Sequence, residues 1–280
     1  MKSTINRTED GTIELTITIP WSDIQDMYQT VVTETASNTE IAGFRKGKAP
    51  KQIIEENIDK TKTYEETIKR LVPKAYTDAV MEQKVAPIMM PQIELKSAEE
   101  GKDWIVLAKT CERPVVTLKD YKKAVADVKA AKGGSKILVP GKEDTQPKGP
   151  SVDEVLDALL TAIEAKLPGI LLEHEVTHQL SQLVDQTKKL GLSVEQYLSS
   201  TGKTADSIRA DFRAQAAKNL TLEFGLEAIA EQEKVTVSEA EVDKLLSTAK
   251  SPEERTALEG QRYYLTSLIR RQKTLDGLMA

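Results

Sequence analysis

A basic loop, residues 41–51, holds the side chains of this sequence that are best suited to binding chemistry. It contains no Asp or Glu, although the whole chain carries a formal net charge of −5. Phe44 stands between Gly43 and Arg45, and three lysines follow. An aromatic ring beside cations suits stacking on a nucleic-acid base while the cations pair with phosphate. The loop therefore predicts a docking tip for a polyanion, with an ordinary solvated turn as the alternative.

A second motif has the residues of a zinc hydrolase. His174 and His178, with Glu175 between them, match H-E-x-x-H, in which two histidines one helical turn apart bind zinc and the Glu serves as base. The chain has 2 His in total, so a third ligand would have to be a carboxylate such as Glu195. The apolar stripe through Val176 turns both histidines toward solvent, at about 100° per residue. We expect exposed histidines and no bound metal, and a zinc metalloprotease stays a remote alternative.

The remaining composition argues against several classes of protein. The single cysteine, Cys111, falls in an expected strand and is interpreted as a small core residue. One cysteine excludes an intramolecular disulfide and is typical of a reducing cytoplasm. The sequence has no signal-peptide run and no apolar stretch of about 18–20 residues, so we expect a cytoplasmic protein without a membrane partner. Glycine-rich phosphate-binding motifs are also missing, and we expect no cofactor and no catalytic residue.

The elements around the basic loop form a first predicted domain, residues 1–113. An Asp10-Gly11 turn joins two of its strands, of which the second alternates apolar and polar residues. A short helix is expected to begin near Pro50, which needs no hydrogen-bond donor there. Strands are predicted over residues 2–8, 12–19, 92–97 and 103–112, and helices over 21–39 and 61–84. The basic loop then lies between helices that pack on an antiparallel sheet.

A second domain is predicted over residues 151–280, after a linker over residues 114–150 with room for a short helix. The linker is rich in Gly and Pro and has little to bury. From residue 151 the pattern is helical throughout, with helix N-caps expected at Ser151, Ser193, Ser238 and Ser251. The predicted fold class is therefore α+β, an antiparallel sheet with helices followed by an all-α domain.

The basic loop and its surroundings resemble the trigger factor family of ribosome-associated bacterial chaperones. Gly-Phe-Arg-Lys-Gly-Lys-Ala-Pro at residues 43–50 resembles the ribosome-docking signature of that family. The proline-rich return to a strand at residues 85–94 is also similar. Leu-Pro-Gly-Ile-Leu-Leu-Glu at residues 167–173 resembles the start of the family's C-terminal domain. The resemblance is strong over residues 1–113 and weaker over residues 151–280.

The resemblance implies a chaperone that docks beside the exit tunnel of the large ribosomal subunit, where it contacts ribosomal RNA and protein. Such a chaperone holds nascent or unfolded polypeptides without ATP, and neither DNA nor a membrane is an expected partner. The main alternative is a cytoplasmic helical holdase or assembly factor that does not bind ribosomes. The residues implied to bind the ribosome are Gly43, Phe44, Arg45, Lys46, Gly47, Lys48 and Pro50.

One part of the family pattern is not expected here. The family usually carries a middle prolyl-isomerase domain of the FK506-binding type, with an aromatic-lined pocket. Residues 114–150 alone separate the two recognisable parts, and Tyr121 is the one aromatic residue between positions 114 and 196. The sequence therefore predicts a short form of the family without the isomerase domain and without isomerase activity.

Overall fold

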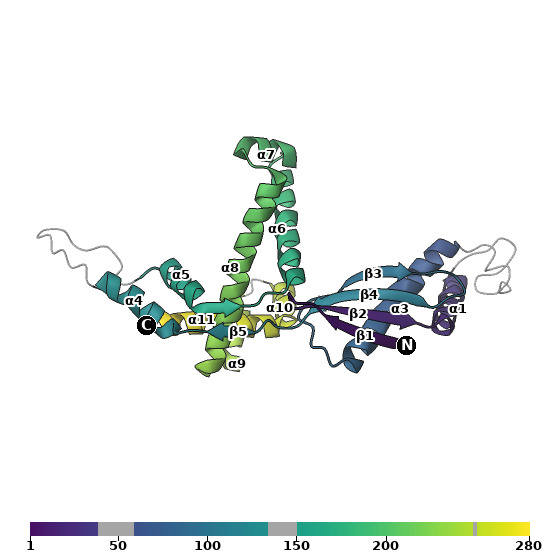
Figure 1. Ribbon diagram of the computed structural model, residues 1–280, viewed down its shortest axis with the longest axis horizontal. Helices are drawn as coiled ribbons and strands as arrows, with labels where there is room; N and C mark the ends of the chain where they lie inside the picture. Colours follow the sequence, from purple (N-terminus) through teal and green to yellow (C-terminus); the bar gives the residue numbers. More distant parts are fainter. Residues whose placement is uncertain (39–58, 134–149, 249–250) are drawn as a thin grey trace, which may run out of the picture. The chain divides into compact units, whose positions relative to one another are not determined.

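The computed structural model describes residues 1–38, 59–133, 150–248 and 251–280 (Figure 1). These residues form two compact units. Unit 1 is Met1–Arg113 together with Pro168–Ile170, and unit 2 is Pro114–Leu167 together with Leu171–Ala280. Each unit has a hydrophobic core of its own.

Unit 1 is built on an antiparallel sheet whose strands lie in the order β1-β2-β4-β3. The alternating pattern of β2 turns its isoleucines and Leu15 into the core, and Gly11, at φ +87°, closes the hairpin to β1. The strands are β1 (Lys2–Arg7), β2 (Thr12–Ile19), β3 (Gln92–Ser97) and β4 (Trp104–Cys111). The predicted strands of the first domain are confirmed.

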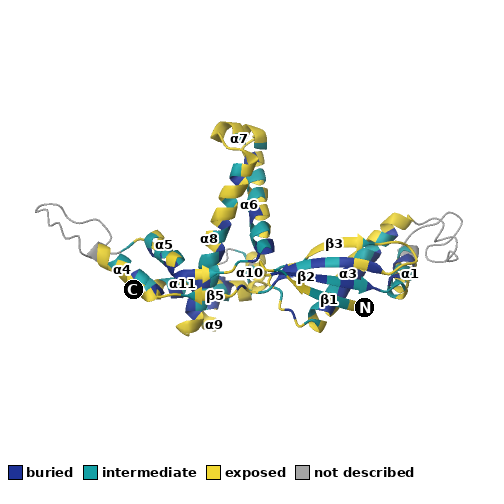
Figure 2. Ribbon diagram, viewed as in Figure 1, coloured by how far each residue is buried: buried dark blue, intermediate teal, exposed yellow. Residues whose placement is uncertain are grey.

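Helices α1 (Trp21–Asn38) and α3 (Lys60–Glu82) cover the face of the sheet to which the buried side chains of β2 point. Ile24 of α1 and Leu71 of α3 share one core with Leu15 and Trp104 of the sheet. Figure 2 shows the buried stripe along β2, whereas β3 is mostly exposed. The sheet therefore fixes both helices that flank residues 39–58.

Unit 2 is mostly helical and contains one further pair of strands, β5 and β6. Its elements are β5 (Val116–Leu118), α4 (Tyr121–Gly133), α5 (Val152–Ala162), β6 (Ile163–Ala165), α6 (Gly169–Lys189), α7 (Val194–Thr201), α8 (Ala205–Gln232), α9 (Glu239–Leu246), α10 (Pro252–Glu259) and α11 (Arg262–Met279). α5 begins at the predicted capping box, in which the Glu154 N–H donates to the Ser151 hydroxyl at 3.3 Å. The predicted N-caps Ser193 and Ser251 are confirmed in the same way.

Clusters of buried apolar side chains stabilise the described part of unit 2. The larger core joins α4, α5 and β6 to α8, with Val125, Leu159, Ile163 and Ile229 buried in it. A smaller one joins α9 to α11. Figure 1 shows α6 and α8 running side by side as a helical hairpin with α7 at its tip, and Glu173 of α6 pairs with arginines of α8.

Two expectations from the sequence need correction. Residues 114–133 are not linker with little to bury, because β5 pairs with β6 and Tyr121 of α4 is 3% exposed in the core of unit 2. The expectation of helix throughout from residue 151 is wrong at β6, where Ile163 leaves α5 with extended backbone at φ −111° and ψ 126°. Pairing with β5 supplies some of the hydrogen bonds that a continued helix would have made, among them that from the Lys166 N–H to the Val115 carbonyl at 3.3 Å.

Candidate functional site

The residues predicted to bind the ribosome lie outside the part of the chain that the structure describes. They are Gly43, Phe44, Arg45, Lys46, Gly47, Lys48 and Pro50, and the expected short helix after Pro50 lies outside it as well. The structure does describe the two helices on either side of this segment, α1 and α3, which we call the frame. α1 ends at Asn38 before it, and α3 begins at Lys60 after it.

Polar contacts cap the start of α3 and join α3 to α1. Asp59 caps α3, with its carboxylate accepting from the Thr61 N–H at 3.0 Å. The Arg70 guanidinium of α3 contacts the Glu34 carboxylate of α1 at 2.6 Å and that of Glu66 at 3.0 Å. The segment between the helices is therefore carried on two helices that are bound to each other by charge as well as by the core.

Aromatic rings add a second connection between the same elements. The Tyr28 and Tyr64 rings lie 4.8 Å apart between centroids, and the Tyr64 and Trp104 rings lie 6.0 Å apart. Burial is the main reason that the pKa of the Tyr64 hydroxyl is raised. These contacts run from α1 through α3 to β4, so that the frame is continuous with the sheet.

Unit 2 offers exposed apolar side chains instead of a charged site. Tyr263 of α11 is 88% exposed and its neighbour Tyr264 is also exposed, while Leu190 and Leu192 lie exposed near the tip of the α6–α8 hairpin. The tyrosine pair was not predicted from the sequence. Its position next to Leu265, which is buried, could have indicated that the two rings face away from the core.

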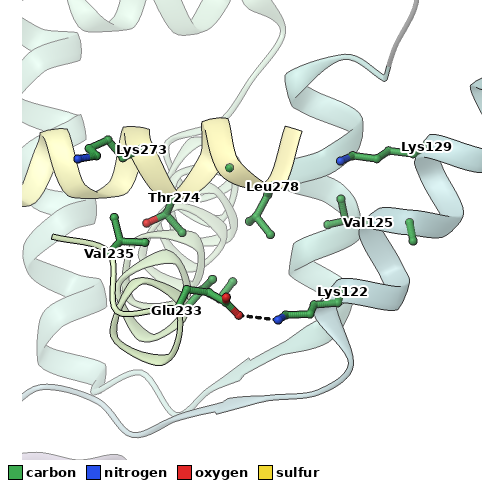
Figure 3. Close-up of a pocket in the computed structure, with 11 residues that line it drawn as sticks. Lys122, Val125, Lys129, Glu233, Val235, Lys273, Thr274 and Leu278 are labelled. Atoms are coloured by element: carbon green, nitrogen blue, oxygen red, sulfur yellow. Dashed lines mark ion pairs between the residues drawn. The ribbon is translucent and has the colours of Figure 1, made fainter. Parts of the chain in front are cut away.

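A hollow of about 370 Å³ lies among α4, α8 and α11 (Figure 3). Val125, Ile229 and Leu278 contribute its apolar part, and the Lys122 ammonium at its rim pairs with the Glu233 carboxylate at 2.8 Å. None of the described residues that line it is aromatic. This hollow therefore lacks the rings of an aromatic proline-binding pocket.

His174 and His178 lie exposed on α6, as the apolar stripe predicts, while Val176 is buried. The side chain of Gln182 contacts the His178 ring at 2.8 Å, and the Gln179 amide donates to Glu175 at 3.0 Å. Within the described ranges, no three His, Cys, Asp or Glu side chains are grouped so that they could hold a metal ion. The H-E-x-x-H pattern here belongs to the outer face of an amphipathic helix.

Cys111 is buried at the end of β4, as predicted for a core residue. Burial raises the pKa of its thiol to about 11, which keeps the thiol protonated near neutral pH. Over the described part of the chain, the helices are too short or too polar for any of them to cross a bilayer.

Two models of one protein family match the chain. The model described as bacterial trigger factor protein matches residues 1–133, and the model of the trigger factor C-terminus matches residues 150–279. Between the two matches remain residues 134–149, and no isomerase domain is found there. The matched ranges place the basic loop in the N-terminal part of the family.

Curated relatives agree with these matches. The trigger factor of Streptomyces coelicolor is 25% identical over 190 residues, 66% of this chain and 41% of that protein. The trigger factor of Lactiplantibacillus plantarum is 34% identical over 109 residues, 39% of this chain and 25% of that protein. The chain thus spans less than half the length of these relatives.

A solved structure has the same fold. It is described as promiscuous substrate recognition in folding and assembly activities of the trigger factor chaperone, and it matches with a TM-score of 0.64 at 14% identity. The match covers 100% of this chain and 99% of that one. With the N-terminal and C-terminal family models both matched in order, the chain belongs to the trigger factor family.

Proposed function

We propose that this protein is a ribosome-associated chaperone of the cytoplasm that holds emerging polypeptides without ATP. The observation that carries the proposal is the match of the family's N-terminal and C-terminal models, in order, to one chain. Residues 43–50 resemble the ribosome-docking signature of the family, and we therefore propose them as the segment that contacts the ribosome. Ribosomal RNA and protein beside the exit tunnel are the proposed docking partners.

In the docking step, Phe44 stacks while Arg45 and Lys46 pair with phosphate or acidic groups on the ribosome. The frame of α1 and α3 supports this role, because a segment carried on two joined helices can be presented without disturbing the sheet. Phosphate pairing releases counterions, so binding should weaken steeply with added salt.

Holding of clients is proposed for unit 2. Its exposed tyrosines lie on α11 and the exposed Leu190 and Leu192 in the connection between α6 and α7, and they form no single deep pocket with the residues described, which suits weak binding to many sequences. No isomerase activity is proposed, because the family match leaves room for no isomerase domain between its two parts.

The test of docking is co-sedimentation with large ribosomal subunits. We expect Phe44→Ala, Arg45→Ala and Lys46→Ala together to reduce pelleting by about tenfold or more at low salt, because phosphate contacts dominate such binding. A matched control, Lys188→Ala with Lys189→Ala, removes as many positive charges from the exposed end of α6 and should pellet normally.

Pelleting of the triple variant like the wild type would show that the loop is not the docking site. If the wild-type protein itself fails to pellet yet suppresses client aggregation, it is a holdase that works away from the ribosome, and the docking half of the proposal is wrong.

A further inference from the structure

The pairing of β5 with β6 leaves backbone groups that face outward. The Lys119 N–H donates to the Ala162 carbonyl at 2.8 Å, and the Lys166 N–H donates to the Val115 carbonyl at 3.3 Å. In an antiparallel pair, residues whose groups point to the partner alternate with residues whose groups point away. The register, with Ala165 opposite Val116, therefore turns the N–H and C=O of Ala165 to the outer edge of β6.

These outward groups are unpaired in the part of the chain that is described. No residue there hydrogen bonds to the N–H or C=O of Ala165, or to the C=O of Ile163, which points the same way. Unpaired groups in a row along a strand edge are a template for another strand. The edge of β6 is therefore chemically suited to a polypeptide backbone.

A hollow of about 730 Å³ lies along this edge. Successive residues of β6, Ile163, Glu164 and Ala165, all line it, although neighbouring side chains of a strand point to opposite faces. Val115, just before β5, and Thr117 of β5 line it as well, so the hollow reaches the edge of β6 and continues over the face of the sheet that carries these two side chains. Its opposite wall is α8, where Ala217 and Thr221 are small and leave space for an incoming chain.

We propose that the outer edge of β6 receives an extended segment of a client polypeptide as an added strand, an inference that rests on the proposed holding function. An extended backbone supplies donors and acceptors at the spacing of Ala165 and Ile163. Main-chain hydrogen bonds do not depend on which side chains the client carries. One strand edge could therefore bind client segments of many sequences.

Charged side chains at the rim of this hollow limit which client segments are favoured. Glu164 is paired with the Lys119 ammonium at 2.5 Å, whereas Lys166 and Lys218 have no ion pair with the residues described. The rim therefore carries uncompensated positive charge. A client segment with small or β-branched residues and an acid at its ends is favoured.

The shortness of β6 sets the strength of the contact. With three residues in the strand, an added segment gains few main-chain hydrogen bonds, and binding is weak and readily reversed. Weak capture matches a holding step that must release its client for folding.

The first experiment uses the full chain and a fluorescein-labelled peptide, Asp-Val-Thr-Val-Thr-Val-Asp, followed by fluorescence anisotropy. Ala165→Pro removes the outward N–H and spares the bonds to β5, since Pro is tolerated at a strand edge. We expect its Kd for the peptide to rise about fivefold or more. The control Ala165→Val adds comparable bulk, keeps the N–H, and should bind within about twofold of the wild type.

The second experiment tests the wild-type chain and does not depend on how the Pro variant folds. The same peptide N-methylated at alternate residues lacks the donors and should lose binding about fivefold, and the unmodified peptide should slow hydrogen exchange at the Ala165 amide. Equal binding of both peptides, or of Ala165→Pro and the wild type, would overturn the inference. So would no binding of the unmodified peptide. If client aggregation is still suppressed in that case, the proposed holding function stands without the edge.

Discussion

Tyr121 joins α4 to the end of α8 through one hydrogen bond. Its buried hydroxyl donates to the Glu233 carboxylate at 2.6 Å, and Glu233 also pairs with Lys122. Tyr121→Phe removes the donor and keeps the ring in place. We expect the free energy of unfolding of unit 2 to fall by about 1 kcal/mol, measured by urea denaturation with far-UV circular dichroism. An unchanged transition would mean that Glu233 is satisfied by Lys122 alone.

The same contact gives unit 2 an alkaline pH dependence. Burial, and then Glu233, raise the pKa of Tyr121 from 10.0 to about 12. A phenol whose pKa is higher in the folded state than in the unfolded state stabilises the fold. This stabilisation is complete below the pKa of the unfolded state and is lost as the pH rises through the pKa of the folded state. Between pH 10 and 12, the free energy of unfolding should therefore fall more steeply for the wild type than for Tyr121→Phe. Parallel curves for the two proteins would contradict this assignment.

At the scale of elements, β6 packs on α8 through a close approach at Gly225. A Cβ placed on Gly225 would come within 2.4 Å of the Ile163 Cδ1 and 3.0 Å of its Cγ2. Ala in a helix is normally better than Gly by about 1 kcal/mol, but overpacking a buried Ile costs about 1–3 kcal/mol. We expect Gly225→Ala to lower the free energy of unfolding by about 1 kcal/mol in thermal denaturation.

The matched control for that change is Gly277→Ala in α11, where nothing lies within 4 Å of the added Cβ. It should raise the free energy of unfolding by up to about 1 kcal/mol. If both substitutions stabilise the protein, the Ile163 side chain can move to make room for the added Cβ. The contact between β6 and α8 at Gly225 is then not tightly packed, and the prediction is wrong.

Local signals in the sequence were enough for most elements. Strict alternation predicted β2, and serine N-caps predicted α5, α7 and α10, because both signals depend on residues close together in the chain. β6 was missed because its pairing partner, β5, lies more than 40 residues away and α5 runs directly into it. Short strands with distant partners leave no periodic pattern to read.

The candidate site was predictable only in part, for a similar reason. The outward direction of His174 and His178 follows from the helical period, and it is confirmed. The role of Phe44 and its neighbours stays a prediction, since they lie outside the described residues. The unpaired edge at Ala165 depends on which residues of two strands face each other, and that register is a tertiary property.

At the scale of the whole molecule, the packing of α4 changes which fragments should fold. A fragment of residues 151–280 lacks β5 and α4, and with them Tyr121 and Val125 of the core. A fragment of residues 114–280 keeps both. We expect the longer fragment to unfold cooperatively in urea and the shorter one to unfold in a broad transition with exposed apolar surface, measured by dye binding.

Residues 1–113 provide the comparison fragment. Trp21 and Trp104 both lie in unit 1, so that tryptophan fluorescence reports on this part alone. The fragment should fold and should pellet with ribosomes while suppressing aggregation poorly. If it carries the full holding activity, unit 2 is not the client-holding part.

The core of unit 2 brings together segments that a ribosome makes far apart in time. Val125 of α4 packs in one cluster with Leu278 of α11, whereas the sheet and helices of unit 1 are complete once residue 113 has emerged. N-terminal domains generally fold first during synthesis, and distant contacts form slowly. A newly made copy of this protein would therefore have the sheet and helices of residues 1–113 in place while β5 still lacks its partner β6 and α4 still lacks α8 and α11. During that interval the chain is in the same position as the clients it is proposed to hold.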